Sequence, residues 1–167
     1  HCWGCGQRIR LPNSYVLGWE SDMIGVTKAG FIHEYEIKLT VADFLADVKK
    51  EKHMDITLWT AGIRERQRTN KSGFGWRSKV VRPANYFWYI MSEEIAEKII
   101  VPVYAGLLIV KSYGFLSRKN APRLHAEKIS EKQMNQLIGR AIERFWAMRR
   151  RFVTNGLTLT ESFSEVG

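Results

Sequence analysis

The sequence predicts a single α/β domain over residues 1 to 156. A strand-like segment from Phe31 to Leu39 runs directly into a helix-start signal. Further along, two strongly apolar, strand-like runs at residues 86–91 and 105–110 flank a short helical segment, and an amphipathic helix pattern follows Ser130. Strands that alternate with helices in this way are typical of a sheet covered by helices. We therefore expect a central β-sheet flanked by helices.

The segment before the first helix is expected to form a β-hairpin. Glycines and a proline in residues 1 to 13 indicate an N-terminal element followed by a turn, and residues 14 to 18 suit a short strand. Met23 to Val26 form a short apolar run, as in a buried strand. The four residues from Thr27 to Gly30 end in glycine and predict the hairpin turn that leads into the strand at Phe31.

The strand from Phe31 to Leu39 has one apolar face and one charged face, because successive side chains in a strand point to opposite sides of the sheet. The apolar side, where a core is expected, carries Phe31, His33, Tyr35, Ile37 and Leu39. The other side, where a site is expected, carries Ile32, Glu34, Glu36 and Lys38. Two carboxylates on a buried strand repel each other and need compensation, which a divalent cation would supply. We expect His33 to be a core histidine with its hydrogen bonds satisfied.

The next helix is expected to start after Thr40. Thr40 is a good N-cap, and Asp43 three residues later completes a capping box with Asp in place of Glu. Apolar positions then continue at helical spacing. Lys49, Lys50 and Lys52 follow at the C-terminal turn of this helix, where cations favour the helix dipole. The same lysines are candidate phosphate contacts.

Residues 54 to 82 carry seven lysines and arginines against two acidic residues. Glycines and aromatic residues are interleaved with the basic ones, and we expect a loop or hairpin insertion here. Ordered insertions of this length are often functional. The basic side chains can hold a nucleic-acid backbone while Trp59, Phe74 and Trp76 stack on splayed bases. Packing of these aromatic side chains beneath the loop explains the pattern equally well.

The last third of the chain ends in the clearest amphipathic helix. Ser130 can cap it, with Gln133 at the reciprocal position of a capping box. An apolar stripe from Met134 to Trp146 indicates a core face or a dimer face. Residues 157 to 167 are expected to form a C-terminal tail.

The composition points to a polyanionic partner. The net charge of +9 at pH 7 favours nucleic acid first and an anionic membrane surface second. The longest mostly apolar run, Ile99 to Val110, contains Pro102 and is shorter than the roughly 20 residues of a spanning helix, so no membrane partner is expected. Cys2 and Cys5 lack a second ligand pair for zinc, and so few cysteines suit a reducing compartment such as the cytoplasm.

Asp22, Glu36 and Lys38 form a minimal set of groups for phosphodiester hydrolysis. Asp22 lies on one strand of the predicted hairpin, and Glu36 and Lys38 lie on the next. The carboxylates can hold Mg²⁺ through hard oxygen ligands, and the ion lowers the pKa of a bound water that attacks phosphorus. The adjacent carboxylates favour the charged form of Lys38, so its role is positioning and charge neutralisation rather than proton abstraction. A surface salt-bridge cluster is the alternative explanation.

Several segments resemble the restriction-endonuclease-like superfamily of PD-(D/E)XK nucleases, and within it the small MmcB-like proteins assigned to DNA repair and related phage-associated proteins. The resemblance falls within residues 18–53 and 83–125 and covers about half of the chain. The matching segments are Glu20-Ser21-Asp22-Met23, Glu36-Ile37-Lys38 with Asp43-Phe44 and Asp47, Tyr86 to Tyr89, and Pro102 followed by Gly106-Leu107-Leu108-Ile109.

The resemblance implies a mixed central β-sheet flanked by helices and a Mg²⁺-dependent DNA endonuclease, with Mn²⁺ as a substitute ion. The implied catalytic residues are Asp22, Glu36 and Lys38. The implied metal ligands are Asp22, Glu36, the backbone carbonyl of Ile37 and, as further candidates, Glu20 and Glu34. Two features depart from the family pattern. Ser21 replaces the motif proline, and no acidic residue precedes Glu20 to serve as the upstream helical glutamate of many relatives.

The expected partner is DNA, bound in the cytoplasm of a bacterial or phage-infected cell during repair, recombination or phage DNA processing. The candidate DNA contacts are Lys49, Lys50, Arg64, Arg66, Arg68, Lys71, Arg77 and Lys79. A homodimer would allow one site per chain to cut both strands. Two other interpretations remain open: a non-catalytic nucleic-acid-binding protein on the same fold, and an RNA-directed nuclease.

Overall fold

The structure, a computed structural model, describes residues 7–15, 17–69, 72–73 and 75–154. The chain divides into two compact units, His1–Ile129 and Ser130–Gly167, and each is described by itself. The predicted single domain over residues 1 to 156 spans both units and stays a prediction. Outside the described residues lie Cys2, Cys5, Lys71, Phe74 and the predicted tail over residues 157 to 167.

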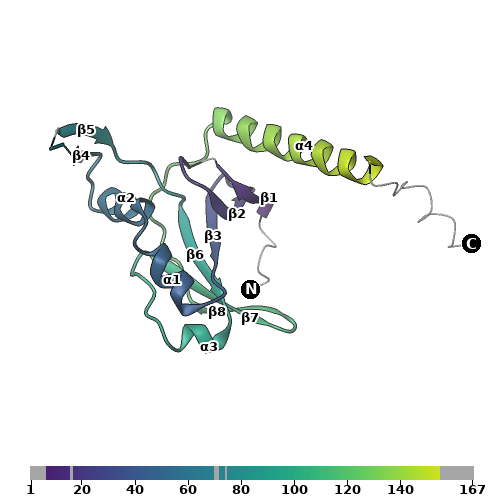
Figure 1. Ribbon diagram of the computed structural model, residues 1–167, viewed down its shortest axis with the longest axis horizontal. Helices are drawn as coiled ribbons and strands as arrows, with labels where there is room; N and C mark the ends of the chain where they lie inside the picture. Colours follow the sequence, from purple (N-terminus) through teal and green to yellow (C-terminus); the bar gives the residue numbers. More distant parts are fainter. Residues whose placement is uncertain (1–6, 16, 70–71, 74, 155–167) are drawn as a thin grey trace, which may run out of the picture. The chain divides into compact units, whose positions relative to one another are not determined.

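The first unit is built on a six-stranded sheet in the order β1-β2-β3-β6-β7-β8 (Figure 1). Its strands are β1 (Gln7–Ser14), β2 (Ser21–Thr27), β3 (Ile32–Ile37), β6 (Tyr86–Met91), β7 (Ala105–Lys111) and β8 (Gly114–Lys119). β3 runs parallel to β6 and β6 runs parallel to β7, whereas the other neighbouring strands are antiparallel. The predicted α/β class with a mixed sheet is confirmed.

The hairpin between β2 and β3 turns where the sequence predicts. The Thr27 amide donates to the Phe31 carbonyl at 2.9 Å, and the Gly30 amide donates to the Thr27 carbonyl at 3.0 Å. Gly30 has a φ of 84°, in the left-handed region that glycine adopts without a steric penalty. Local turn chemistry therefore decides this connection.

The predicted strand at residues 14 to 18 is wrong, because the first strand is β1 at Gln7–Ser14. Pro12 suggested a turn, yet it lies inside β1 opposite Met23 of β2. β1 is an edge strand, and a residue without an N–H is tolerated at an edge because only one side of the strand is paired.

The helices described in the first unit are α1 (Val41–Asp47), α2 (Glu51–Thr60) and α3 (Glu93–Ala96). α1 begins as predicted, with the Asp43 amide donating to the Thr40 hydroxyl oxygen at 3.0 Å. Its predicted continuation through Lys52 is wrong. The chain turns after Asp47, whose carbonyl accepts from the Lys50 amide at 2.8 Å, and a second helix starts there. Lys50 is the N-cap of α2, and Lys52 lies in its first turn.

The basic insertion is a hairpin of β4 (Glu65–Thr69) and β5 (Gly75–Lys79), which form a separate two-stranded sheet. The hairpin extends away from the six-stranded sheet, beyond α2 (Figure 1). A backbone hydrogen bond of 2.8 Å from Val80 to Arg64 joins its two ends. The predicted start of the insertion at residue 54 is wrong, because residues 54 to 60 belong to α2 and Ile56 is fully buried in the core.

The main core lies between one face of the sheet and the helices α1, α2 and α3. Its buried side chains include Phe44, Ile56, Phe87, Tyr89, Met91, Ala96 and Ile109. The opposite face of the sheet buries Tyr35, Ile90 and Leu108. Full burial of one large apolar side chain contributes about 1.5–3 kcal/mol. This packing fixes the helix ends that carry Asp47 and Lys52 over β3.

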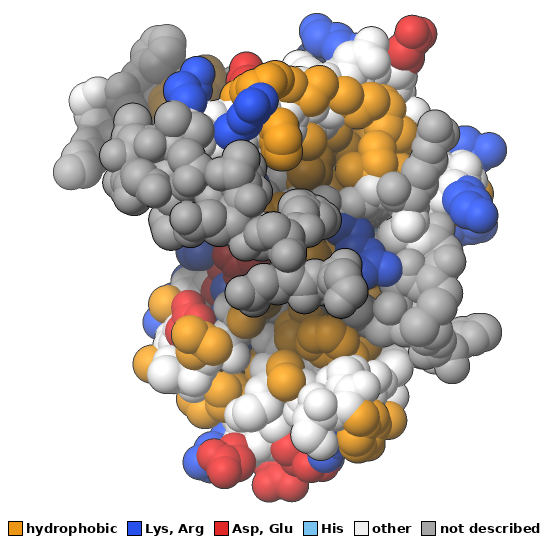
Figure 2. Space-filling model, turned by 90° about the vertical axis from the view of Figure 1, so that its right-hand side faces the viewer, with side chains coloured by type: hydrophobic (Ala, Val, Ile, Leu, Met, Phe, Trp, Pro, Cys, Tyr) orange, Lys and Arg blue, Asp and Glu red, His pale blue; other side chains and the backbone are white. Residues whose placement is uncertain are grey.

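The second unit contains the long helix α4 (Glu131–Thr154). Its predicted capping box is confirmed, because the Ser130 amide donates to Gln133 Oε1 at 3.1 Å and the Gln133 amide donates to Ser130 Oγ at 3.3 Å. Hydrophobic side chains gather along this helix with basic side chains beside them (Figure 2). The rings of Phe145 and Trp146 pack edge to face, with 5.5 Å between their centroids.

None of the helices in the described part of the chain combines the length and the apolar character needed to cross a membrane.

Candidate active site

The charged face of β3 is buried. Glu34 is fully buried, and Glu36 and Lys38 are each only 3% exposed. These side chains lie on the face covered by α1 and α2, since Lys38 contacts Asp47 of α1 and Glu36 contacts Lys52 of α2. The prediction that these residues share one face is confirmed.

The opposite face of β3 is only partly a core. Tyr35 is buried, but Ile37 is 44% exposed and Leu39 is 80% exposed, so the expected core face is wrong at these two positions. The reason is that β3 ends at Ile37. His33 has its expected partner, since Trp88 Nε1 donates to His33 Nδ1 at 3.1 Å. Burial lowers the pKa of His33 to about 4, which keeps the ring neutral.

The two carboxylates at the centre of the site are both paired with lysines. Glu36 lies between Lys38 Nζ, 3.0 Å from its Oε2, and Lys52 Nζ, 2.6 Å from its Oε1. Asp47 Oδ1 lies 3.2 Å from Lys38 Nζ and 2.8 Å from Lys50 Nζ. Of the two strand carboxylates that the sequence predicts to need compensation, Glu36 is thus paired with two ammonium groups, whereas Glu34 is not.

Hydrogen bonds fix the charge state of Asp47 and Lys38. Burial by itself raises the pKa of Asp47, but the hydrogen bonds from His53 and Lys50, with the charges of Lys52 and Lys38, outweigh it and hold the pKa well below its ordinary value. Burial opposes the charge on Lys38 as well, yet Glu36 and Asp47 raise its pKa above the ordinary value. Lys38 is therefore an ammonium ion at neutral pH.

Asp22 is attached to the end of β3. Its Oδ2 accepts a hydrogen bond of 2.8 Å from the amide of Ile37, the residue between Glu36 and Lys38. Asp22 is half-buried and is the second residue of β2, the strand next to β3. The three predicted catalytic residues therefore lie together where β2 begins and β3 ends, and the Ile37 carbonyl belongs to the same segment.

Glu34 anchors the segment that precedes β2. Its Oε1 accepts from Trp19 Nε1 at 2.8 Å and from Ser21 Oγ at 2.9 Å. Its Oε2 is buried without a hydrogen-bond partner among the described residues. Burial raises the pKa of Glu34 to about 7. Ser21, which stands where the family pattern has proline, thus has a structural role of its own.

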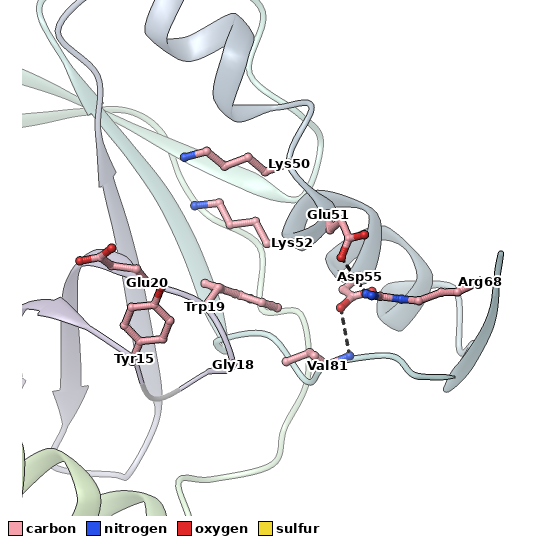
Figure 3. A pocket seen from close by; sticks show the side chains of 10 residues that line it. All are labelled: Tyr15, Gly18, Trp19, Glu20, Lys50, Glu51, Lys52, Asp55, Arg68 and Val81. Atoms are coloured by element: carbon pink, nitrogen blue, oxygen red, sulfur yellow. Dashed lines mark hydrogen bonds and ion pairs between the residues drawn. The ribbon is translucent and has the colours of Figure 1, made fainter. Parts of the chain in front are cut away.

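A cavity of about 400 Å³ opens beside the buried charges (Figure 3). Lys50 and Lys52 extend from the start of α2 toward the side of the cavity where Glu20 lies (Figure 3). The other lining residues are Tyr15, Gly18, Trp19, Glu51, Asp55, Arg68 and Val81. The lining combines three basic side chains with three acidic ones, and the ammonium groups of Lys50 and Lys52 are the part of it that can contact an anionic group such as a phosphate.

The predicted DNA contacts fall into two groups, side chains held by ion pairs or ring stacking against α2 and side chains exposed to solvent. Arg66 belongs to the first group, because it pairs with Asp55 and Glu51 of α2, each at 3.2 Å, and its side chain is only 9% exposed. Arg68 also pairs with Glu51, at 2.7 Å. Arg64 stacks 3.8 Å from the centre of the Trp59 ring. These contacts hold the hairpin against α2.

The exposed basic side chains are Lys49, Lys50, Arg77 and Lys79. Lys50 contacts Asp47 but keeps 61% of its side chain exposed, and Arg77 keeps 82% exposed. Trp76, on the same strand as Arg77, is 42% exposed, whereas Trp59 lies under Arg64. The packing interpretation therefore holds for Trp59, while stacking of Trp76 on bases stays a prediction.

Sequence reasoning missed the contribution of α2. The sequence predicts Lys52 at a helix C-terminus, but its Nζ lies 2.6 Å from Glu36 Oε1, and it assigns Asp47 no role beyond the matching segment. His53 Nε2 lies 2.9 Å from Asp47 Oδ2, and the Tyr104 hydroxyl lies 2.8 Å from His53 Nδ1. A break signal at residues 48 to 50 would have revealed these roles, but the sequence there is lysine-rich and without glycine or proline.

Comparisons with known proteins identify the fold and not the activity. No family model matches the chain, and no curated protein matches it. A solved structure described as the SPO1766 protein of unknown function from Silicibacter pomeroyi is similar, with a TM-score of 0.55 and 19% sequence identity. The similarity covers 84% of this chain and 79% of that chain. At this identity the likeness concerns the fold alone.

Proposed function

We propose that the chain is a Mg²⁺-dependent DNA endonuclease that hydrolyses phosphodiester bonds at the end of β3. The observation that carries the proposal is the hydrogen bond from the Ile37 amide to Asp22, because it joins one acid to the Glu36-x-Lys38 segment at a single sheet edge. The neighbouring cavity, with Lys50 and Lys52 in its wall, offers room for a phosphate. Two acids, a lysine and an anion site together suit phosphoryl chemistry.

The sheet topology supports the finer fold assignment. The resemblance to PD-(D/E)XK nucleases implies a mixed sheet flanked by helices, with the acid and the E-x-K segment on neighbouring strands. Here β1, β2 and β3 are successive antiparallel strands, and β6 joins β3 in parallel. Asp22 on β2 and Glu36 on β3 occupy neighbouring strands in this arrangement.

The donor atoms suit Mg²⁺ in kind. Mg²⁺ prefers oxygen ligands, and it would be held by Asp22, Glu36 and the Ile37 carbonyl, with Glu20 and Glu34 as additional oxygen donors. Among the described residues, no three acidic, histidine or cysteine side chains are already gathered around a metal position. Lys52, on Glu36 Oε1, has to yield that oxygen. A bound ion would stabilise negative charge on the phosphate and lower the pKa of its water.

The chain's own residues supply positioning and charge. Lys38 is protonated and fixed between Glu36 and Asp47, so it neutralises charge on the phosphate oxygens rather than removing a proton. The Ile37 amide keeps Asp22 in place. Lys50 and Arg68 line the cavity, where they can contact the substrate backbone.

The proposed setting is DNA in the cytoplasm of a bacterial or phage-infected cell, during repair, recombination or phage DNA processing. The net charge of +9 supports a polyanionic partner. The exposed Arg77, Lys79 and Lys49 are the proposed backbone contacts. A homodimer would place two sites on the two strands of a duplex.

The test is cleavage of supercoiled, linear and branched DNA, and of RNA, with Mg²⁺ or Mn²⁺. We expect Glu36→Ala and Lys38→Ala to lose activity by about 10²–10³-fold or more, because the first removes a proposed metal ligand and the second removes a positive charge that stabilises the reacting phosphate. Lys98→Ala, at an exposed lysine outside the proposed DNA contacts, is the matched control and should retain activity. Cleavage of RNA alone would move the proposal to an RNA-directed nuclease.

A non-catalytic nucleic-acid-binding protein is the second candidate. It is favoured by one observation, the pairing of both Glu36 oxygens with lysines, which makes the buried cluster electrically complete without a metal. If the wild type and both alanine variants are equally inert on every substrate but still shift DNA in a gel, this second function replaces the first.

A further inference from the structure

The helix α4 carries a wide stripe of exposed apolar side chains. Ile138, Ile142 and Phe145 follow one another at intervals of four and three residues, so they lie on one face of the helix. Phe145 is 57% exposed, and Trp146 and Met148 beside it are exposed to a similar degree. Apart from Ser130, the described residues of this unit all belong to α4. No other described element of the unit therefore covers the stripe.

Basic side chains follow both edges of the stripe. Arg140 and Arg144, four residues apart, lie along one edge. Arg150 lies at the other edge, four residues beyond Trp146. The guanidinium of Arg149 lies over the Trp146 ring, 5.2 Å from its centre. An apolar stripe that is bordered by arginines complements a surface with an apolar interior and a negatively charged outer layer.

We propose that α4 binds the surface of an anionic phospholipid bilayer, with its apolar stripe among the acyl chains and its arginines on the lipid phosphates. A strongly amphipathic helix with aromatic residues on one face and arginines on the other is the type that lies in this interface. Such a helix lies along the surface, so this mode differs from the membrane-spanning segment that the sequence argued against. The inference is independent of the proposed nuclease activity, because it concerns the other unit of the chain.

Charge argues against a second copy of α4 as the occupant of the stripe. If two copies formed a coiled coil, Ile138 and Phe145, seven residues apart, would both lie in its core. Arg144 and Arg149 would then flank the core, and in a parallel pair they would face each other across the two helices. Glu143 would lie on the side farthest from the partner helix, where it compensates neither arginine. Like charges at these positions oppose self-association.

The width of the stripe favours a bilayer over a single acidic partner helix. Consecutive residues lie about 100° apart around a helix, so Phe145 and Trp146 together widen the stripe. With Met148 on the other side of Phe145, the apolar side chains cover roughly half of the circumference. A partner helix covers only the narrow seam of a coiled coil, whereas a bilayer covers the whole width. Trp146 at the border also suits a bilayer, because its ring is apolar and its N–H stays in the polar layer.

The first test is co-sedimentation of the full chain with lipid vesicles. We expect binding to vesicles of phosphatidylcholine and phosphatidylglycerol in equal parts, and binding weaker by about tenfold or more to phosphatidylcholine alone. The net charge of +9 by itself attracts anionic vesicles, so the decisive variant keeps the charge. The double variant Ile142→Ser, Phe145→Ser should bind the anionic vesicles about tenfold or more weakly than wild type, because it removes the inserted side chains.

Gln136→Ser, at an exposed polar residue of the same helix, is the matched control and should bind like wild type. Equal binding by the double variant and wild type overturns the inference, because charge alone then explains the attraction. No binding by wild type overturns it as well. Light scattering in solution then assigns the stripe to a second copy if wild type is a dimer that the double variant dissociates, and to a partner protein if wild type is a monomer.

The second test measures whether Trp146 enters the acyl region, with a substitution that keeps an aromatic side chain. The anionic vesicles are prepared with phosphatidylcholine brominated on its acyl chains, and bromine quenches the fluorescence of a tryptophan that lies among those chains. We expect wild type to be quenched and Trp146→Phe to lose most of the bromine-dependent quenching while it still binds. Trp76→Phe, at an exposed tryptophan of the β4–β5 hairpin, should be quenched like wild type. Quenching that is unchanged by Trp146→Phe overturns the inference.

Discussion

Two regions of the molecule use the same residue types in opposite ways. Around Glu36 and Asp47, Lys38 and Lys52 are buried, and each carboxylate has at least two basic neighbours. In the β4–β5 hairpin, by contrast, Arg77 is paired with Glu65 at 3.7 Å and remains 82% exposed. A buried ion pair loses a great deal when one partner is removed, whereas an exposed pair contributes little. Removing a basic side chain should therefore cost more folding stability in the first region than at Arg77 of the hairpin.

The largest effect is expected for Asp47→Asn in the buried cluster. Asp47 is fully buried and pairs with the buried Lys38 and Lys52, so the loss of its charge leaves two buried ammonium groups sharing Glu36. We expect the free energy of unfolding to fall by about 3–5 kcal/mol, measured by urea denaturation. Asp43→Asn, an exposed acid on the same helix, should cost less than about 1 kcal/mol. Equal losses would show that burial does not distinguish these two carboxylates.

Within the hairpin, Arg66 and Arg77 should show the same difference between a buried and an exposed ion pair, with a smaller change in stability. Arg66→Met leaves the buried Asp55 without its guanidinium partner, and we expect a loss of about 3 kcal/mol in the free energy of unfolding. Arg77→Met should leave stability within about 1 kcal/mol of wild type, since its ion pair is exposed. For DNA binding the order should reverse: Arg77→Met weakens binding and reduces the salt slope by about 1. A DNA affinity that is unaffected by Arg77→Met would remove the hairpin from the proposed interface.

The opposite face of β3 gives a third and smaller effect, at a buried group without a counter-charge. Burial lowers the pKa of His33 to about 4 from 6.5, so the unfolded chain takes up a proton that the folded chain refuses. The stability due to neutral His33 is therefore complete above about pH 6.5 and is lost as the pH falls toward about 4. We expect the wild type to lose about 1–3 kcal/mol relative to His33→Gln over this window. Parallel pH profiles for the two proteins would contradict it.

The local signals in the sequence were sufficient for much of the fold. The turn that ends in Gly30, the Thr40 cap and the Ser130 cap each depend on residues within four positions of one another, and all three form as predicted. The strand, short helix and strand from Tyr86 to Lys111 also form, because a continuous apolar run leaves few alternatives. Such features are decided by the segment itself.

The sequence was sufficient to predict the site residues on β2 and β3, but not those that the helices contribute. Alternation along one strand was enough to place Glu34, Glu36 and Lys38 on one face. The contribution of Lys52 depends on a helix break between Asp47 and Glu51, and the lysine-rich sequence there contains neither glycine nor proline. The contact that gives Lys52 its place in the site is tertiary, since its Nζ lies 2.6 Å from Glu36 Oε1 on β3. Single-sequence reasoning has no access to such a contact.

The closed ends of the β4–β5 hairpin have a consequence for how this protein can vary. The hydrogen bond from the Val80 amide to the Arg64 carbonyl joins the two ends of the hairpin, and Arg66 and Arg68 hold its first strand, β4, against α2. The entropic cost of closing a longer loop between these ends is small, because the free energy of loop closure rises by only about 0.6 kcal/mol for each doubling of loop length. The tip beyond Arg68 can therefore be lengthened, shortened or exchanged while the sheet and the buried charges stay as they are.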